Sequence, residues 1–204
     1  MSADAKHAGP LADPVTKASL RRDLRRARRG LSPDARRTAH EAIADALVTV
    51  LVDLPAAAPI ALYAARPDEV DLAPLVARIG RRFAWPRVDG LLLSFVEARA
   101  TDLVPGYRGL LEPPPDRTAL DPRALAAVLV PGLGFDPHGG RLGTGGGHYD
   151  RTLADPAFAT ALRIGIAYAC QVVPALPVEP HDIRMQLLVT DLGLVPLDPR
   201  TSAC

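Results

Sequence analysis

Short apolar runs of strand length alternate with helical segments along most of the chain, and this alternation limits the possible folds more than any other feature. The runs lie at residues 59–65, 82–88, 91–98, 126–131, 162–169 and 187–191. Strands that are apolar throughout are typical of parallel sheets buried on both faces. Helices are expected at 72–80 and from about Asp150, and the run at 187–191 is expected to be the last strand. The pattern predicts an α/β fold in which helices flank a mostly parallel open sheet.

A helix is predicted over residues 16–30, before the first strand. Thr16 can act as its N-cap and Gly30 can end it. Its apolar side is expected to contain Leu20, Leu24 and Ala27. The remaining arginines are interpreted as a solvated basic face: Arg22, Arg25, Arg26, Arg28 and Arg29.

A second helix is predicted to begin with Ser32 as its N-cap and Pro33 in its first turn. Its apolar residues recur at helical spacing: Ile43, Ala46, Leu47, Val50 and Leu51. The residues before this helix pair are polar and end at Pro14. We therefore expect a disordered tail over residues 1–14 and a single α/β domain over residues 15–204.

The composition argues against several classes of protein. Of the 204 residues, 48% are hydrophobic and 23% are charged, as in ordinary globular domains. Nucleic-acid binding through the arginine-rich stretch 21–29 is a competing hypothesis, but the net charge is only +1 and no aromatic residues are interleaved there. No run approaches the ~20 apolar residues of a membrane span, and no apolar signal segment begins the chain. With only two cysteines, we expect a cytoplasmic protein that binds neither nucleic acid nor membrane.

A glycine-rich segment, residues 130–150, holds eight of the chain's 16 glycines. It follows an apolar strand and precedes a predicted helix, which is the usual position of a ligand crevice in open α/β sheets. Successive glycine amides beside a helix N-terminus can bind phosphate. The spacing matches neither the P-loop nor the dinucleotide-binding fingerprint. We interpret the segment as a phosphate cradle without a packing role, and a mobile surface loop is the alternative.

Charged residues near these glycines suit a nucleotide with a divalent ion. Arg141 can clamp a phosphate through two hydrogen bonds. Asp150 and Asp182 are candidate ligands for Mg²⁺, which prefers one or two carboxylates together with phosphate oxygens. Taken singly, each aspartate has a helix cap or a turn as its alternative role.

The segment GLGFDPHGGRLGTGGGHYDR (132–151) closely resembles the signature of the 5-formyltetrahydrofolate cyclo-ligase family, also called methenyltetrahydrofolate synthetases. The resemblance covers most of the chain, with the family's other motifs in the family's order: KASLRRDLRRARRGLSPDAR (17–36), PDEVD (67–71), WPRV (85–88), LLEP (110–113) and PHD (180–182). It implies a fold like those of the NagB, RpiA and CoA-transferase proteins, and a monomer.

The resemblance implies an enzyme that converts 5-formyltetrahydrofolate and MgATP to 5,10-methenyltetrahydrofolate, ADP and phosphate. A formamide carbonyl is a poor electrophile, and its oxygen is a poor leaving group. Phosphorylation of that oxygen by ATP allows N10 to attack the formyl carbon and phosphate to leave. Such an enzyme mainly positions reactants and neutralises developing charge.

The resemblance also assigns site residues. The ATP-binding set is Lys17, Arg21, Arg141, Leu142, Gly143, Thr144, Gly145, Gly146, Gly147, His148 and Tyr149, and within it the catalytic set is Lys17, Arg141, His148 and Tyr149. The folate-binding set is Ala64, Glu69, Thr144, Gly145, Gly146, Gly147 and His148, with Glu69 accepting N–H donors of the pterin. The metal set, for Mg²⁺, is Asp150 and Asp182.

Four positions depart from the family pattern. Thr144 stands where a tyrosine or basic residue is usual, His148 and Arg108 each stand where an aromatic is usual, and Gln186 stands where aspartate is frequent. These departures concern substrate contacts and rate more than ATP binding. The alternative function is therefore a folate- or nucleotide-binding relative with weak or no cyclo-ligase activity.

Overall fold

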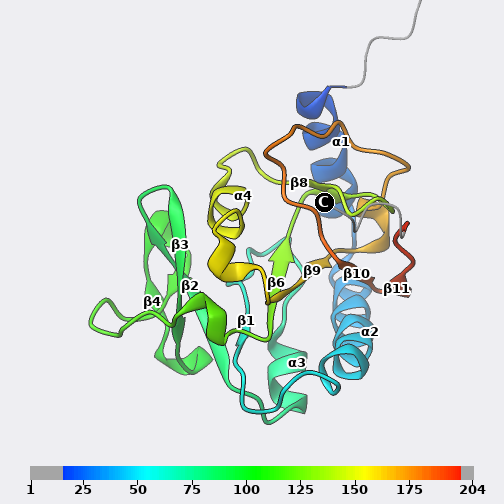
Figure 1. The fold of residues 1–204 in the computed structure, drawn as a ribbon. Helices are drawn as coiled ribbons and strands as arrows, with labels where there is room; N and C mark the ends of the chain where they lie inside the picture. Colours follow the sequence, from blue (N-terminus) through cyan, green and yellow to red (C-terminus); the bar gives the residue numbers. More distant parts are fainter. Residues whose placement is uncertain (1–15, 199–204) are drawn as a thin grey trace, which may run out of the picture.

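A seven-stranded sheet organises the computed structural model, which describes residues 16–198 (Figure 1). The strands are β1 (Ile60–Ala61), β2 (Phe83–Asp89), β3 (Leu92–Glu97), β6 (Ala127–Pro131), β9 (Leu162–Ile166), β10 (Leu187–Thr190) and β11 (Gly193–Val195). Their order across the sheet is β11-β10-β9-β6-β1-β2-β3. The five inner strands, β10 to β2, pair in parallel, and the edge strands β3 and β11 pair antiparallel to their neighbours. The predicted mostly parallel sheet is confirmed.

Two details of the strand prediction are wrong. The strand expected at 59–65 is only two residues long, because the chain leaves the sheet after Ala61 and enters the loop that carries Glu69. The run at 187–191 is not the last strand, since β11 follows it after a turn at Asp191 and Leu192 and begins with Gly193, whose φ is +99°. β11 is only three residues long, and its burial does not follow an apolar pattern that a sequence reading could recognise.

Two small hairpins were not expected. One pairs β4 (Val104–Pro105) with β5 (Leu111–Glu112), and the other pairs β7 (Gly134–Phe135) with β8 (Arg141–Leu142). The second hairpin lies within the glycine-rich segment. This segment is therefore partly ordered sheet and only partly loop.

The predicted helix pair is present as α1 (Lys17–Arg29) and α2 (Pro33–Leu51). Thr16 and Ser32 accept the N-cap hydrogen bonds as expected, and Gly30 is the C-cap of α1. Two shorter helices follow, α3 (Ala73–Arg78) and α4 (His148–Leu153). The expected tail over residues 1–14 and the chain end at 199–204 lie outside the described residues.

The apolar side of α1 differs from the predicted one. Leu24 is buried, but Ala27 is exposed and Arg28 takes its place in the interior. The residue spacing explains why Arg28 is buried in place of Ala27. Leu20, Leu24 and Arg28 are four residues apart and therefore lie on the same side of the helix. The interpretation of Arg28 as a solvated residue is therefore wrong.

The core lies on both faces of the sheet, as the continuously apolar strands predicted. On β6, Ala127 and Leu129 join the cluster beneath α2 and α3, whereas Val128 and Val130 join the cluster on the side of α4. Figure 1 shows α1 and β8 at the end of the sheet toward which β6 runs. Among the described residues, no helix has both the length and the apolar character needed to cross a bilayer.

The first half of the glycine-rich segment has a packing role, contrary to the prediction. Leu133, Phe135 and Leu142 are buried, and a Cβ placed on Gly132 would lie 2.7 Å from the ring of Phe135. A Cβ on Gly134 would lie 2.4 Å from a methyl group of Leu24. Glycine at these positions permits close packing against α1 and the sheet. Only the second half, residues 143–147, remains a candidate cradle.

Candidate functional site

A cavity of about 700 Å³ lies beyond the carboxyl ends of β1 and β6. Its wall contains many of the residues that the family resemblance assigns to ATP or folate: Ala64, Glu69, Arg141, Gly143, Thr144, Gly145, Gly146, Gly147, His148 and Tyr149. The tertiary structure thus brings together residues that are separated by up to about 85 positions in the sequence. This is also the edge at which open α/β sheets bind ligands.

The second half of the glycine-rich segment presents its main chain at this cavity. Gly145 and Gly147 have φ of +109° and +67°, a backbone region that other residues rarely adopt. Thr144 is exposed, as are its neighbours Gly145 and Gly146. Arg21 donates from Nε to the carbonyl of Gly143 at 3.0 Å, so α1 holds the start of this loop. Arg151 donates to the carbonyl of Gly146 at the other end, so the loop is held at both ends while the residues between them stay exposed.

Leu142 differs from its neighbours in the loop. Its side chain is buried in a small apolar cluster with Leu24 and Leu176. Its carbonyl accepts a hydrogen bond of 2.7 Å from the N–H of Leu133. Any part that Leu142 plays in nucleotide binding therefore falls to its main-chain N–H.

Lys17 lies at the N-terminus of α1 and pairs with Asp182. Its Nζ is 2.8 Å from a carboxylate oxygen of Asp182 and 3.3 Å from one of Glu179. Burial opposes the charged form of Lys17, but the two carboxylates outweigh it and raise the pKa above its usual value. Burial likewise opposes ionisation of Asp182, and the hydrogen bond from Lys17 reverses this and lowers its pKa. Both groups are therefore charged at neutral pH.

Arg141 and Asp150 form a second ion pair at the start of α4. The Nη2–Oδ2 distance is 2.8 Å, and the side chain of Arg141 is only 5% exposed. The same guanidinium donates to the carbonyl of Pro131 at 3.2 Å and lies 5.5 Å from the ring centre of Tyr149. Burial raises the pKa of Tyr149 well above its usual value despite this neighbouring charge, so its hydroxyl stays protonated.

The two predicted metal ligands therefore lie in different ion pairs. Asp182 belongs to a group of possible ligands with Glu179 and His181, whose ligand atoms all lie within 4.8 Å of one another. Asp150 is not in that group and is engaged by Arg141. Two carboxylates of this group suit Mg²⁺, whereas the imidazole of His181 suits it poorly. Both carboxylates would be available to Mg²⁺ only once their cations release them, Asp182 from Lys17 and Asp150 from Arg141.

Arg28 is the functional candidate that the sequence reading missed. Its side chain is 4% exposed and donates to Asp68 at 2.8 Å and to Glu69 at 3.5 Å. Burial opposes ionisation of Asp68, but the hydrogen bond from Arg28 outweighs it and lowers the pKa. A signal was present in the sequence, because Arg28 lies 11 residues after Lys17 and so on the same side of the helix.

Comparison with known proteins gives the same assignment as the motifs. The model of the family described as the 5-formyltetrahydrofolate cyclo-ligase family matches residues 13–191. The chain belongs to this family. The cyclo-ligase of Escherichia coli K12 is 32% identical over 175 residues, which cover 82% of this chain and 96% of that protein. The cyclo-ligase of Mycolicibacterium smegmatis is 32% identical over 192 residues, covering 90% of this chain and 98% of the relative.

Solved structures of family members have the same fold. The 5,10-methenyltetrahydrofolate synthetase of Aquifex aeolicus superposes with a TM-score of 0.72 at 30% identity, covering 92% of this chain and 96% of that chain. The synthetase of Mycoplasma pneumoniae gives a TM-score of 0.71 at 25% identity, covering 87% and 99%. The predictions of the family, of its fold and of a ligase are therefore confirmed.

Two of the departures from the family pattern, Arg108 and His148, line the cavity and lie near the same ring, that of Tyr107. The rings of Tyr107 and His148 have centres 6.0 Å apart, and the guanidinium of Arg108 lies 5.2 Å from the centre of the Tyr107 ring. Arg108 has a φ of +51°, which is uncommon for a residue with a side chain. Tyr107 therefore supplies an aromatic ring one residue before the position at which the cyclo-ligase family usually has one.

Gln186 lies elsewhere. Its amide oxygen accepts a hydrogen bond from the N–H of Arg163, and its own N–H donates to the carbonyl of the same residue, each at 2.9 Å. Gln186 does not line the cavity. This departure consequently concerns the pairing of β9 with the segment before β10, and not a substrate contact.

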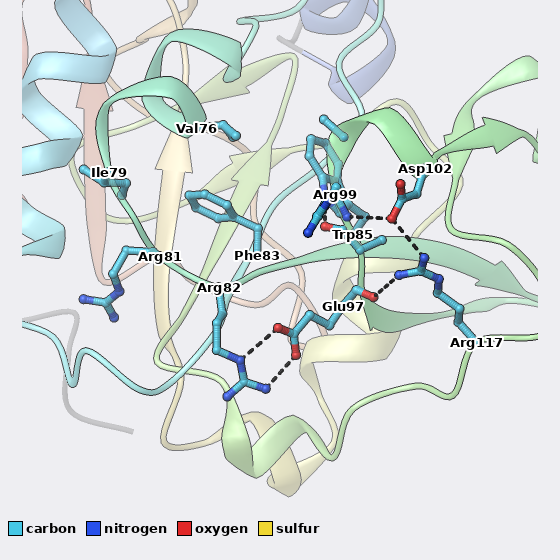
Figure 2. Close-up of a pocket in the computed structure, with 12 residues that line it drawn as sticks. Val76, Ile79, Arg81, Arg82, Phe83, Trp85, Glu97, Arg99, Asp102 and Arg117 are labelled. Atoms are coloured by element: carbon cyan, nitrogen blue, oxygen red, sulfur yellow. Dashed lines mark hydrogen bonds and ion pairs between the residues drawn. The ribbon is translucent and has the colours of Figure 1, made fainter.

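A second cavity, of about 910 Å³, lies at the amino-terminal end of β2 (Figure 2). It is rich in arginine, but Figure 2 shows Arg82 paired with Glu97 and Arg117 reaching Asp102, so much of the positive charge is neutralised. Arg81 is occupied by main-chain carbonyls. None of the residues assigned from the cyclo-ligase resemblance lines this cavity. We therefore treat it as separate from the candidate site.

The free energy of unfolding is expected to fall as the pH drops below about 4. Asp68 and Asp182 have pKa values below the usual one in the folded protein, as does Glu97 beside Arg82. For such a carboxyl group, the stabilisation is complete above the unfolded-state pKa and is lost as the pH falls through the folded-state pKa. Urea unfolding at pH 6, 5, 4 and 3 measures this loss. Asp68→Asn should weaken the pH dependence, and a profile unchanged by that substitution would contradict the assignment.

Proposed function

We propose that the protein is an ATP- and Mg²⁺-dependent 5-formyltetrahydrofolate cyclo-ligase that acts as a cytoplasmic monomer and releases 5,10-methenyltetrahydrofolate, ADP and phosphate. The observation that carries the proposal is the joint position of Glu69 and the loop 143–147 in one cavity. A carboxylate suited to a pterin thereby faces a glycine cradle suited to a triphosphate. Membership of the cyclo-ligase family supports the same reaction.

The reaction needs the formyl oxygen to become a leaving group. In our proposal ATP transfers its γ-phosphoryl group to that oxygen, which gives an iminium phosphate and ADP. N10 of the folate then forms a bond to the formyl carbon and loses its proton, and the C–O bond breaks to release phosphate, which can take up that proton. The protein contributes by aligning the two substrates and by placing positive charge where the phosphoryl group is transferred.

The two ion pairs suggest how the cations become available to the nucleotide. Two of the predicted phosphate-binding cations are paired with predicted metal ligands, Lys17 with Asp182 and Arg141 with Asp150. When triphosphate oxygens approach, the cations can exchange carboxylate for phosphate. The two carboxylates are then free to hold Mg²⁺, which neutralises charge on the phosphate oxygens. Each cation keeps an anionic partner throughout this exchange, because phosphate oxygens replace the carboxylate.

The remaining residues have two kinds of role, which are positioning of the loop and hydrogen bonding to the substrates. Arg21 holds the loop at Gly143, and we assign the N–H groups of residues 143–147 to the phosphates. His148 and Tyr149 lie at the boundary between the nucleotide loop and the folate part of the cavity, beside Arg141. We assign His148 to contact with the formyl group and Tyr149 to donation of a hydrogen bond from its protonated hydroxyl.

The test is product formation by the purified protein with 5-formyltetrahydrofolate and MgATP. The near-ultraviolet absorbance of the methenyl product should appear, and it should be lost when ATP is omitted or Mg²⁺ is chelated. Tight ATP or folate binding without the absorbance would reject the cyclo-ligase activity. That result would favour the alternative, a binding relative in which Thr144 and His148 have impaired catalysis.

A further inference from the structure

We infer that Arg28 is a positioning residue for the folate-binding carboxylate Glu69. This inference rests on the proposed function, since it concerns how the folate end of that site is held. Nothing in the family motifs distinguishes Arg28 from the other arginines of α1. The structure does, because Arg28 is the one arginine of α1 that is buried.

The contacts of Arg28 converge on the segment around Glu69. Nε and Nη2 donate to one oxygen of Asp68 at 3.2 and 2.8 Å, while Nη1 faces Oε1 of Glu69 at 3.5 Å. The other carboxylate oxygen of Glu69 accepts from the N–H of Arg66 at 3.1 Å. Each oxygen of Glu69 therefore has a donor of its own. A carboxylate held in this way has its plane fixed before any ligand arrives.

The same guanidinium reaches the start of the glycine-rich segment. Nη1 of Arg28 lies 3.5 Å from the carbonyl oxygen of Gly132, and Arg141 donates to the carbonyl of the preceding Pro131 at 3.2 Å. Two buried arginines thus hold adjacent main-chain carbonyls where the chain leaves β6. Arg28 sets the distance between Glu69 and the strand that carries the loop, and that distance is what a folate bridging the two has to match.

Two further contacts restrain the main chain of Glu69 itself. The hydroxyl of Tyr168 donates to the carbonyl of Glu69 at 3.0 Å and is 2.7 Å from Nε2 of His40. This support comes from α2 and from the segment after β9, so it is independent of α1. The carboxylate position, in contrast, depends on Arg28, which is the side-chain donor that faces it.

Helix α1 sets the spacing of the cations along the whole site. Lys17, Arg21 and Arg28 lie on one side of it at spacings of four and seven residues. With 1.5 Å of rise per residue, Lys17 and Arg28 are about 16 Å apart along the axis. The helix thereby carries a cation at the predicted nucleotide end and another at the folate carboxylate. Substitution of Arg28 should accordingly affect folate and leave ATP largely untouched.

The experiment is a double-mutant cycle with Arg28→Gln and Glu69→Gln, read by direct binding. Affinity for 5-formyltetrahydrofolate is measured without ATP, and affinity for MgATP is measured without folate. Arg28→Gln should weaken folate binding roughly 10- to 100-fold, as expected for a charge-assisted contact, and change ATP affinity less than about threefold. Glu69→Gln should weaken folate binding similarly. The double variant should be no weaker than Glu69→Gln alone, because Arg28 acts through Glu69.

Two variants distinguish a positioning role of Arg28 from an effect on the stability of the fold. Arg28→Lys keeps the buried charge beside Asp68 but loses the planar fork, so it should fold and still weaken folate binding. Arg82→Gln removes an arginine from the exposed pair with Glu97 in the second cavity (Figure 2) and should leave both affinities unchanged. Melting temperatures identify any variant that fails to fold.

Several outcomes would overturn the inference. Additive losses in the cycle would mean that Arg28 acts independently of Glu69. Equal weakening of folate binding and ATP binding would indicate a general structural role of Arg28. Normal folate binding by the folded Arg28→Lys variant would indicate the same. Because binding is measured without turnover, a wild-type protein that binds the folate but forms no product would refute the proposed function and leave this test intact. A wild-type protein that does not bind the folate would overturn the inference.

Discussion

Arg141→Gln is expected to lower kcat by about 10² to 10³, with a smaller change in the KM for folate. Arg141 lines the cavity together with the glycine cradle and Glu69, so in the proposed reaction its positive charge can act on the phosphoryl group as it moves between substrates. Charge that is aimed at a transition state in a buried site affects kcat more than ground-state binding. Rates with 5-formyltetrahydrofolate and MgATP, each varied at saturation of the other, give the two parameters.

A matched control is needed because Asp150 loses its partner when Arg141 is replaced. Arg141→Lys retains a positive charge beside Asp150 and should recover stability but only part of kcat, since lysine cannot contact Asp150 and Pro131 together. Arg123→Gln removes an exposed arginine from its pair with Asp121 and should not change kcat. A folded Arg141→Gln variant with normal kcat would remove Arg141 from the catalytic set.

Gly139→Ala is expected to lower the free energy of unfolding by about 3 kcal/mol, the largest single effect on stability that we anticipate. Gly139 has a φ of +76°, and a Cβ there would lie 2.6 Å from the carbonyl oxygen of Met185. Strain from the left-handed conformation alone costs about 1–2 kcal/mol. The contact with Met185 adds to it, because main-chain atoms hydrogen-bonded to Gly139 cannot move aside freely.

Gly90→Ala provides the control for this prediction. Gly90 also has a positive φ, of +60°, but nothing lies within 4 Å of the position of its Cβ. Only the conformational strain applies there, so a loss of about 1 kcal/mol is expected. Chemical unfolding of both variants and of the wild type gives the difference. Equal losses at Gly139 and Gly90 would show that crowding against Met185 contributes nothing.

Local patterns predicted most of the secondary structure because local forces decide it. Thr16, Ser32 and Gly30 cap their helices as expected, since capping depends on residues within one turn. The apolar run at 126–131 became β6, with alternate side chains in the two core clusters. β11 escaped prediction because a three-residue edge strand exists only through its pairing with β10.

The glycine-rich segment shows the limit of composition as evidence. Glycine density alone does not distinguish a position that needs close packing from one that binds a ligand, because both require the absence of a Cβ. The structure separates them, with Gly132 and Gly134 packed against Phe135 and Leu24, and Gly145 open at the cavity. The environment of each glycine depends on residues distant in the chain.

The amino-acid sequence by itself determined the family, the order of the helices and of the longer strands, and the residue types of the site, since motifs and periodicity are properties of neighbouring residues. Only the tertiary structure decided which charges meet: Lys17 with Asp182, Arg141 with Asp150, and Arg28 with Glu69. The partners in two of these pairs are 41 and 165 residues apart. Burial also depends on chain packing, and it distinguishes Arg28 from the other arginines of α1, which are half-buried or exposed. Coulomb and hydrogen-bond energies depend on distance in space and on local burial, and neither can be read from separation along the chain.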